Sequence, residues 1–348
     1  MDAYREIEKV ELTLSEIQDI LERIKRVKVG VVGDGCLDIY WHADMTLSRL
    51  SRETPHYPLP VVEERLSLGA AANVAANLKR IGAGFITLLT MVSSDWRGGE
   101  FIRLIKELGI DDRNIIVSEK RITPAYCKPL RKGISDVVYE DPRIDFENLS
   151  PLAGQEEERV LERLDRLASQ VDIIAVCDQF RFGVITERVR NRINEMGSGG
   201  KLMVVDSRDN AHLYRNVIIK PNDYECVKAV KKLSSAVDAR MDIFQSAETL
   251  CRITKKPVIV TLGERGSIWV EDGIIKMAPS RPESPPIDIV GAGDTFLSAF
   301  CCAYGAGIPG EKSIGFANLA SAVVVKKLGT TGTAGPEEII AKSKELNL

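Results

Sequence analysis

The sequence is poor in the residues that build soft-metal centres and disulfide frameworks. It holds three histidines and seven cysteines among 348 residues. The histidines (His42, His56 and His212) are far apart and no two cysteines form a C-x-x-C pair, so we expect no zinc site. An odd, scattered set of cysteines is typical of reduced thiols. The pattern therefore predicts a cytoplasmic protein.

Charge and hydrophobicity are spread evenly along the chain. The 47 Lys and Arg nearly balance the 50 Asp and Glu, and the formal net charge is −3. This balance, with no block of like charges, argues against a nucleic-acid partner and against a polybasic membrane anchor. The most apolar stretch, about 290–307, contains Asp294 and is too short and too polar for a membrane span. The charged first residues argue against a secretory signal.

Short apolar runs alternate with amphipathic helical patterns. The run 28–33, followed by Asp34, is typical of a buried parallel strand that ends in a loop. Residues 71–81 place apolar side chains on one face of a helix that ends at Gly82. Further strands are predicted at 85–92, 171–177, 201–206, 217–220 and 257–262, and helices at 98–108, 184–196, 293–305 and 311–327. This alternation predicts an α/β fold with a mostly parallel central sheet and helices on both faces.

Two stretches interrupt the alternation. Residues 39–67 and 122–147 contain prolines and short β-prone pieces, and neither fits a crossover helix. We predict that they form a small β lid beyond the carboxyl ends of the strands, where open α/β sheets bind ligands. Residues 1–26 are predicted to be a helical extension, with its helix at 13–26 capped by Thr13 or Ser15. The whole chain, 1–348, is expected to be a single domain.

The segment 288–296 combines small residues with an acid at the start of a predicted helix. In Gly291-Ala292-Gly293-Asp294, backbone N–H groups can approach a ligand closely, and the helix directs its positive dipole end to the same point. The pattern predicts an anion site beside the Asp294 carboxylate. In phosphoryl transfer, such a carboxylate accepts the proton of the attacking hydroxyl. The alternative is a tight turn followed by an ordinary first-turn acid.

The segment 288–294 resembles the second signature of the ribokinase (phosphofructokinase-B) family of carbohydrate kinases. Other segments match in kind and order, namely 33–38, 69–73, 222–225, 261–266 and 327–332. The resemblance spans about residues 27–340. Within the family it is greatest to the kinases of heptose 7-phosphate, in segments 37–41, 48–55 and 143–147. It implies a ribokinase-like fold and ATP-dependent phosphorylation of a hydroxyl of a sugar or sugar phosphate.

The resemblance also implies a role for individual residues. Asp294 would be the general base, and the N–H groups of Ala292, Gly293 and Asp294, after Gly291, would form an anion hole. The acceptor would be bound by Asp34, Asp38, Gly69, Asn73, Arg49 and Lys128. The nucleotide would contact Asn222, Thr261, Gly263, Gly266, Asn318 and Arg208. Glu225 would organise Mg²⁺ through water, since Mg²⁺ keeps several of its waters, and K⁺ is a further candidate cofactor.

Several of these residues also have a structural interpretation. Glu225 could instead be an ordinary acid in the first turn of a helix, and Asn318 could be a solvated helix residue. Arg208 could be an exposed salt-bridge partner. The chain also departs from the family pattern, because Ala70 stands where a second glycine is usual and Val290 where threonine is usual. A methyl group at Ala70 narrows the approach of a sugar to the backbone. These departures affect the choice of acceptor rather than phosphoryl transfer.

The predicted lid is rich in cations, which favours an acceptor that already bears phosphate. The cations are Arg49, Arg52, Lys128, Arg131, Lys132 and Arg143. Arginine suits phosphate because its fork binds two oxygens at once. Heptose 7-phosphate is therefore the favoured acceptor, and a neutral sugar, as in fructokinases and ribokinases, is the alternative. Nearby carboxylates could instead neutralise these cations on a solvated lid.

Other functions fit less well. A dinucleotide-dependent oxidoreductase would need a third glycine where Asp38 stands, and two acids in that loop would repel a pyrophosphate. A P-loop enzyme is excluded because G-x-x-x-x-G-K-[ST] does not occur. A catalytically weak sugar-phosphate sensor on the same fold is the remaining alternative. No nucleic-acid or membrane partner is expected, and the exposed edges of the lid predict a homodimer through it.

Overall fold

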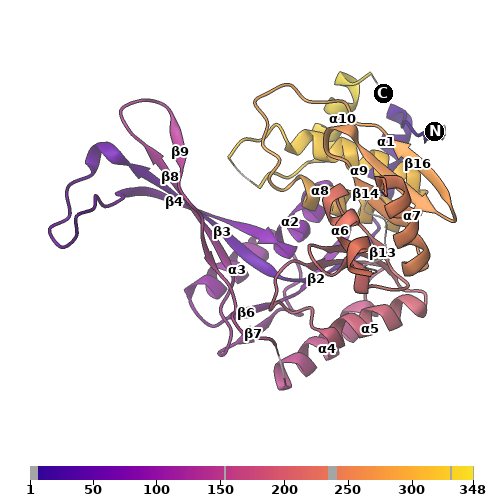
Figure 1. The fold of residues 1–348 in the computed structure, drawn as a ribbon, viewed down its shortest axis with the longest axis horizontal. Helices are drawn as coiled ribbons and strands as arrows, with labels where there is room; N and C mark the ends of the chain where they lie inside the picture. The colour runs from indigo at the N-terminus through magenta and orange to yellow at the C-terminus, as the bar shows by residue number, and fades with distance from the viewer. Residues whose placement is uncertain (1–6, 153, 234–240, 330, 348) are drawn as a thin grey trace.

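The computed structural model describes residues 7–152, 154–233, 241–329 and 331–347. Its central sheet has nine strands in the order β1-β16-β15-β14-β13-β12-β11-β2-β5 (Figure 1). The strands are β1 (Glu8–Lys9), β2 (Lys28–Gly33), β5 (Phe85–Leu89), β11 (Ile173–Asp178), β12 (Leu202–Ser207), β13 (Ile218–Ile219), β14 (Val258–Thr261), β15 (Ser267–Glu271) and β16 (Ile274–Ala278). The strands from β5 to β14 are parallel, whereas β15 and β16 form an antiparallel hairpin that the sequence analysis did not predict.

Helices cover both faces of this sheet, as predicted. One face packs against α1 (Leu14–Ile24), α2 (Ala71–Ile81), α3 (Trp96–Glu107), α8 (Ala292–Gly305), α9 (Gly310–Val324) and α10 (Pro336–Glu345). The other packs against α4 (Gln155–Ala168), α5 (Glu187–Ser198), α6 (Asp223–Leu233) and α7 (Ile243–Thr254). In β2, Val29 and Val31 point into the first core and Val32 into the second, as the two-residue period of a strand requires.

The two predicted excursions form one five-stranded sheet, which we call the lid sheet. It contains β3 (Gly35–Asp44), β4 (Val61–Ala70), β8 (Ala125–Lys132), β9 (Val138–Glu140) and β10 (Ile144–Phe146). Parallel pairing of β3 with β8 joins the two excursions. Figure 1 shows that the far ends of β4, β8 and β9 extend away from the body of the molecule. The lid strands are longer than predicted, and a single residue, Asp34, replaces the loop expected after β2.

Two other predictions need correction. The expected strand 85–92 is divided, because β6 (Met91–Ser93) leaves the central sheet and pairs with β7 (Ile116–Ser118). The predicted helical extension contains a short strand, β1, which pairs with β16 before α1 begins. The capping prediction is confirmed at Thr13, whose hydroxyl accepts from the backbone N–H of Glu16. Residues 1–6 of the predicted extension, and Thr330 in the segment 327–332, lie outside the described residues.

Among the helices that the structure describes, we find none with the length and apolar character needed to cross a membrane.

Candidate active site

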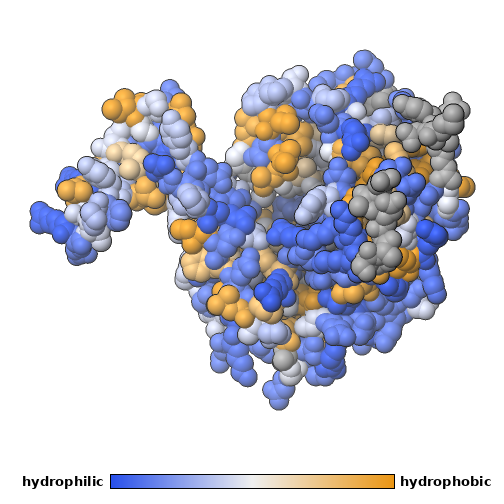
Figure 2. Space-filling model, in the orientation of Figure 1, coloured by the Kyte–Doolittle hydropathy of each residue, from blue (hydrophilic) through white to orange (hydrophobic). Residues whose placement is uncertain are grey.

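The carboxyl ends of β12, β13 and β14 open into a cavity of about 710 Å³ between the body and the lid sheet. Figure 2 shows a hollow between these two parts of the surface. Predicted residues that line the cavity are Asp38, Lys128, Arg208, Asn222, Glu225, Thr261, Gly263, Gly266, Gly291, Ala292, Gly293, Asp294 and Asn318. Segments far apart in the sequence are thus brought together at the edge of the sheet where ligands bind in open α/β folds.

The start of α8 provides backbone donors at the floor of this cavity. Gly291 has φ of 81°, a left-handed conformation that glycine adopts without strain. The N–H groups of Gly293 and Asp294 have no acceptor in the part of the chain that the structure describes. The Ala292 N–H, in contrast, donates to the carbonyl of Ile289 at 3.2 Å. The predicted anion hole is therefore reduced to two N–H groups, because the tight turn at 289–292 uses the third.

Asp294 lies in the first turn of α8, partly open to the cavity and otherwise surrounded by protein. Burial raises the pKa of its carboxyl group to about 7, and the hydrogen bond from Asn73 opposes this increase. The negative charge of Asp206 raises the pKa further, whereas the positive charge of Lys220 lowers it. A carboxyl group with a pKa near 7 is suited to accept a proton at neutral pH.

Asn73, in the first turn of α2, connects the acceptor side of the cavity to Asp294. Its Nδ2 donates to Asp294 Oδ2 at 2.7 Å, and its side chain is almost completely buried. A Cβ atom at Gly291 would lie 3.4 Å from Asn73 Nδ2, an ordinary contact distance, so the positive φ rather than lack of space favours glycine at this position. Both residues were predicted from the sequence, but the direct bond between Asn73 and Asp294 was not.

The lid sheet contributes a buried ion pair to the cavity. Lys128 Nζ lies 3.6 Å from Asp38 Oδ1 and donates to the Tyr40 hydroxyl at 3.1 Å. Burial raises the pKa of Asp38, although the positive charge of Lys128 opposes this shift. Burial alone would lower the pKa of Lys128, but the effects of Asp38 and Tyr40 outweigh it and the pKa is raised. Lys128 therefore carries its charge at neutral pH.

A second lid cation, Arg143, also lines the cavity. Its guanidinium group lies 3.8 Å from the centre of the Tyr126 ring and bonds both oxygens of Asp145, at 2.6 and 2.7 Å. Stacking on one face and pairing along one edge hold the side chain in place.

Four residues predicted to bind the acceptor lie outside the cavity lining: Asn73, which reaches Asp294 from behind, and Asp34, Gly69 and Arg49. Asp34 accepts hydrogen bonds from the N–H groups of Gln179, Phe180 and Val184, at 3.1, 2.9 and 2.7 Å. These bonds turn its carboxylate toward the loop after β11, and the predicted contact with sugar hydroxyls is not supported. Gly69 is buried behind Asp38, where a Cβ atom would lie 2.6 Å from Cys36 Sγ. Arg49 is exposed in the loop after β3, away from the cavity.

The predicted nucleotide residues lie along the other side of the cavity. Asn222 and Glu225 form a reciprocal cap at the start of α6: the Asn222 N–H donates to Glu225 Oε2 at 2.9 Å, and the Glu225 N–H donates to Asn222 Oδ1 at 2.8 Å. Burial, and then the charge of Asp206, raise the pKa of Glu225. Asn318 donates from Nδ2 to the carbonyl of Ala278 at 2.8 Å, so its amide is held at the cavity wall.

Sequence reasoning missed a buried pair at the strand ends, Asp206 and Lys220. Lys220 Nζ lies 2.9 Å from Asp206 Oδ2, and both residues line the cavity. Burial would lower the pKa of Lys220, but Asp206 outweighs it and raises the pKa. The signal was available in the sequence, because each residue stands at the carboxyl end of a predicted strand.

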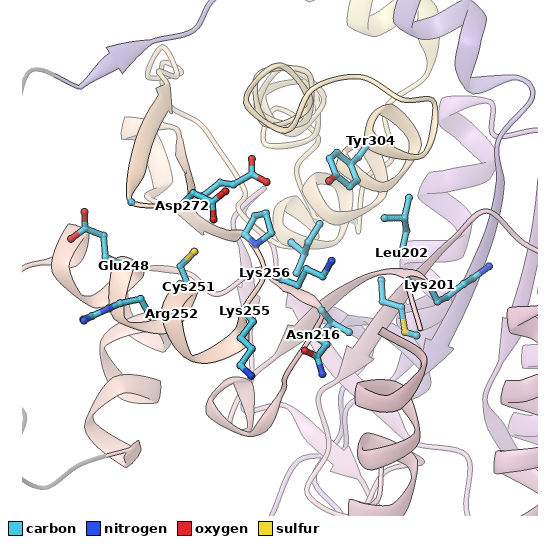
Figure 3. Close-up of a pocket in the computed structure, with 17 residues that line it drawn as sticks. Lys201, Leu202, Asn216, Glu248, Cys251, Arg252, Lys255, Lys256, Asp272 and Tyr304 are labelled. Atoms are coloured by element: carbon cyan, nitrogen blue, oxygen red, sulfur yellow. The ribbon is translucent and has the colours of Figure 1, made fainter. Parts of the chain in front are cut away.

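A second cavity, of about 840 Å³, lies at the opposite edge of the sheet (Figure 3). It is lined by Leu202, Ile218 and Pro257, at the amino ends of β12, β13 and β14, and by charges of both signs. Within the described residues, its lining includes none of the predicted site residues. The smaller cavity, which gathers those residues, is therefore the candidate active site.

Comparison with known families agrees with this geometry. The family model for "pfkB family carbohydrate kinase" matches residues 38–336, which is most of the chain. The chain belongs to the pfkB family of carbohydrate kinases. Its fold is that of ribokinases: it superposes on the ribokinase of Thermotoga maritima with a TM-score of 0.68, at 22% identity, covering 91% of this chain and 99% of that one. Phosphofructokinase-2 of Escherichia coli gives a TM-score of 0.71 at 18% identity, covering 92% and 100%.

Curated relatives of this pfkB-family chain include bifunctional proteins named HldE. The HldE of Trichlorobacter lovleyi is 29% identical over 93% of this chain, and that of Geotalea uraniireducens is 28% identical over 94%. This chain spans 64% and 65% of the length of these relatives.

Proposed function

We propose that this protein transfers a phosphoryl group from ATP to a hydroxyl of a sugar phosphate, with Asp294 as the general base. The observation that carries the proposal is the arrangement at the start of α8. There, a carboxyl group with a pKa of about 7 lies beside two backbone N–H groups without an acceptor in the described chain. Membership in the pfkB family supports the reaction class.

The residues divide the reaction between two sides of the cavity. On the lid side, Asp38 and Asn73 would bind the acceptor and direct its hydroxyl toward Asp294, which takes the proton. The N–H groups of Gly293 and Asp294 would stabilise the charge on the transferred phosphoryl group. On the far side, Asn222, Thr261, Gly263, Gly266 and Asn318 would hold the nucleotide, with Arg208 and Lys220 near its phosphates.

The carboxylates of Asp206 and Glu225 fit Mg²⁺. Both line the cavity, and the charge of Asp206 raises the pKa of Glu225, which places the two acids near each other; Lys220 pairs with Asp206 and lowers the pKa of Glu225. Two carboxylates are enough for an ion that keeps most of its waters. Bound Mg²⁺ would neutralise phosphate charge. We propose K⁺ as a second cation, because phosphofructokinase-2 of Escherichia coli has been determined in complex with potassium.

Lys128 and Arg143 favour an acceptor that already bears phosphate, and the relationship to HldE proteins makes heptose 7-phosphate the first candidate. The other lid cations contribute less, because Arg131 and Lys132 are outside the cavity lining and pair with Asp141 and Asp136 at the surface. Arg49 would contribute only if the loop after β3 moved. One observation favours a neutral sugar instead: Asp38 already partners Lys128.

The acceptor is tested by comparing kcat/KM for heptose 7-phosphate and for the unphosphorylated heptose, with ATP and Mg²⁺, in K⁺ and then in Na⁺. We expect at least a ten-fold preference for the phosphate, about 1.4 kcal/mol, which Lys128→Met and Arg143→Ala reduce. Arg131→Ala is the matched control, since it removes a paired cation from the same strand as Lys128 that does not line the cavity. Preference for the neutral sugar would overturn the phosphate proposal, and no ADP formation with any sugar would favour a sensor.

We also propose that the protein forms a homodimer through the lid sheet. The lid strands and their loops expose a group of apolar side chains, namely Leu47, Leu50, Tyr57, Leu59, Val61, Val62, Ile134, Val137, Val138, Tyr139 and Ile144. Apolar surface is visible on the projecting lid in Figure 2. Exposed apolar strands at a sheet edge favour pairing with another chain.

A further inference from the structure

A buried polar network lies behind Asp294, between α2 and α8. Asn77, one turn after Asn73 on α2, is completely buried and reaches toward Thr295 on α8. Its Nδ2 donates to the Asn73 carbonyl at 3.0 Å and to Asn73 Oδ1 at 3.2 Å. Its Oδ1 accepts from the Thr295 hydroxyl at 2.8 Å. Asparagine is a poor residue for a helix interior, so packing alone does not account for its presence here.

The network fixes the orientation of each amide in turn. The Asn73 backbone carbonyl can only accept a hydrogen bond, so the NH₂ end of Asn77 must face it. The second hydrogen of that NH₂ then holds the Asn73 side-chain oxygen. With its oxygen held on that side, Asn73 presents its own NH₂ to Asp294 Oδ2, at 2.7 Å. The Thr295 hydroxyl completes the network by holding the oxygen of Asn77.

We propose that Asn77 is a positioning residue for the base: it keeps Asn73 in the orientation that donates to Asp294. This inference rests on the proposed function for its effect on the reaction, but not for its effect on the carboxyl group. Without Asn77 the Asn73 amide is free to turn, and its oxygen can then accept from the Asp294 carboxyl group when that group is protonated. Asp294 Oδ2 would lose the donor that favours its ionised form.

Other charged groups near Asp294 are the same with or without Asn77. Asp206 and Lys220 lie at the ends of β12 and β13, and Asp38 faces Asp294 from the lid sheet. Since none of these belongs to α2, a change at Asn77 leaves their charges in place. A shift in the titration of Asp294 would therefore report on the Asn73 amide.

The test is the titration of the Asp294 carboxyl carbon by NMR, in protein labelled with ¹³C at aspartate carboxyl groups and assigned with Asp294→Asn. Loss of a donor to the charged form raises a carboxyl pKa, so we expect Asn77→Ala to move the Asp294 midpoint upward by roughly half a pH unit or more. The low-pH side of the profile of kcat against pH should shift upward by the same amount, and the KM for ATP should not change. Asn114→Ala is the control: Asn114 is also buried and donates to Thr87 at 2.9 Å, outside the cavity.

A second variant keeps the inference testable if Asn77→Ala does not fold. Thr295→Val removes only the hydroxyl that holds the Asn77 oxygen, and a smaller upward shift is expected. An Asp294 midpoint that is unchanged in the folded variants, whatever their loss of stability, would overturn the inference. If no sugar is phosphorylated but the midpoint shifts, the proposed function fails and the positioning role stands.

Discussion

Two aspartates whose carboxyl pKa values are both raised by burial have opposite surroundings in this molecule. Burial raises the pKa of both Asp34 and Asp294 to about 7. Asp34 accepts three backbone N–H groups from the loop 179–184, whereas Asp294 accepts one side-chain amide and faces the cavity. The number of donors already bound therefore distinguishes a structural carboxylate from one free to take a proton.

This distinction predicts different effects of removing the two acceptor-side aspartates. Asp34→Ala would leave three N–H groups without an acceptor, at about 1–3 kcal/mol for each buried unsatisfied donor. We expect the free energy of unfolding, measured by urea denaturation, to fall by about 3 kcal/mol or more. Asp38→Ala is the comparison: it should raise the acceptor KM with a smaller loss of stability. An unchanged stability with a raised acceptor KM in Asp34→Ala would contradict the structural role.

At the scale of elements, the sequence predicted the parts whose patterns are strongest. The strand β2 and the helices α2 and α8 have continuous or periodic apolar residues, and their boundaries agree with the prediction to within a residue. The helices α4, α6, α7 and α10 were not predicted. In α4, many charged residues separate the apolar residues at 160, 164 and 167 and obscure the pattern. The spacing of these three residues is nevertheless that of a buried helical face.

The candidate site was predicted as a set of motifs but not as a geometry. The sequence cannot show that the Ala292 N–H is used within its own turn, or that Arg49 remains in an exposed loop, because both depend on how a loop folds. The junction of β4 and α2 is a similar case. Ala70 has φ of 51° and ψ of −129°, a conformation that is strained for alanine and natural for the glycine usual at this position.

At the scale of the whole molecule, the projecting lid predicts self-association. We expect sedimentation to show a dimer at micromolar concentration. Val62→Asp, in the exposed part of β4, should weaken the dimer at least ten-fold, because a charge would be buried at the interface. Ile274→Asp is the matched control, since Val62 is 59% exposed on the lid and Ile274 is 60% exposed on the body. A wild-type protein that sediments only as a monomer would refute the lid dimer.

The central claim is that Asp294 removes the proton from the attacking hydroxyl. The most direct test is kcat as a function of pH, for the wild type and Asp294→Asn, with ATP and the preferred acceptor. Because the base must be ionised and its pKa is about 7, the wild-type rate should rise from pH 6 to pH 8 and then level off. Asp294→Asn should lower kcat by about 10²–10⁴ and still bind ATP, since the variant keeps the backbone N–H groups that we propose hold the phosphate. A variant with near-normal kcat and the same pH profile would contradict the assignment.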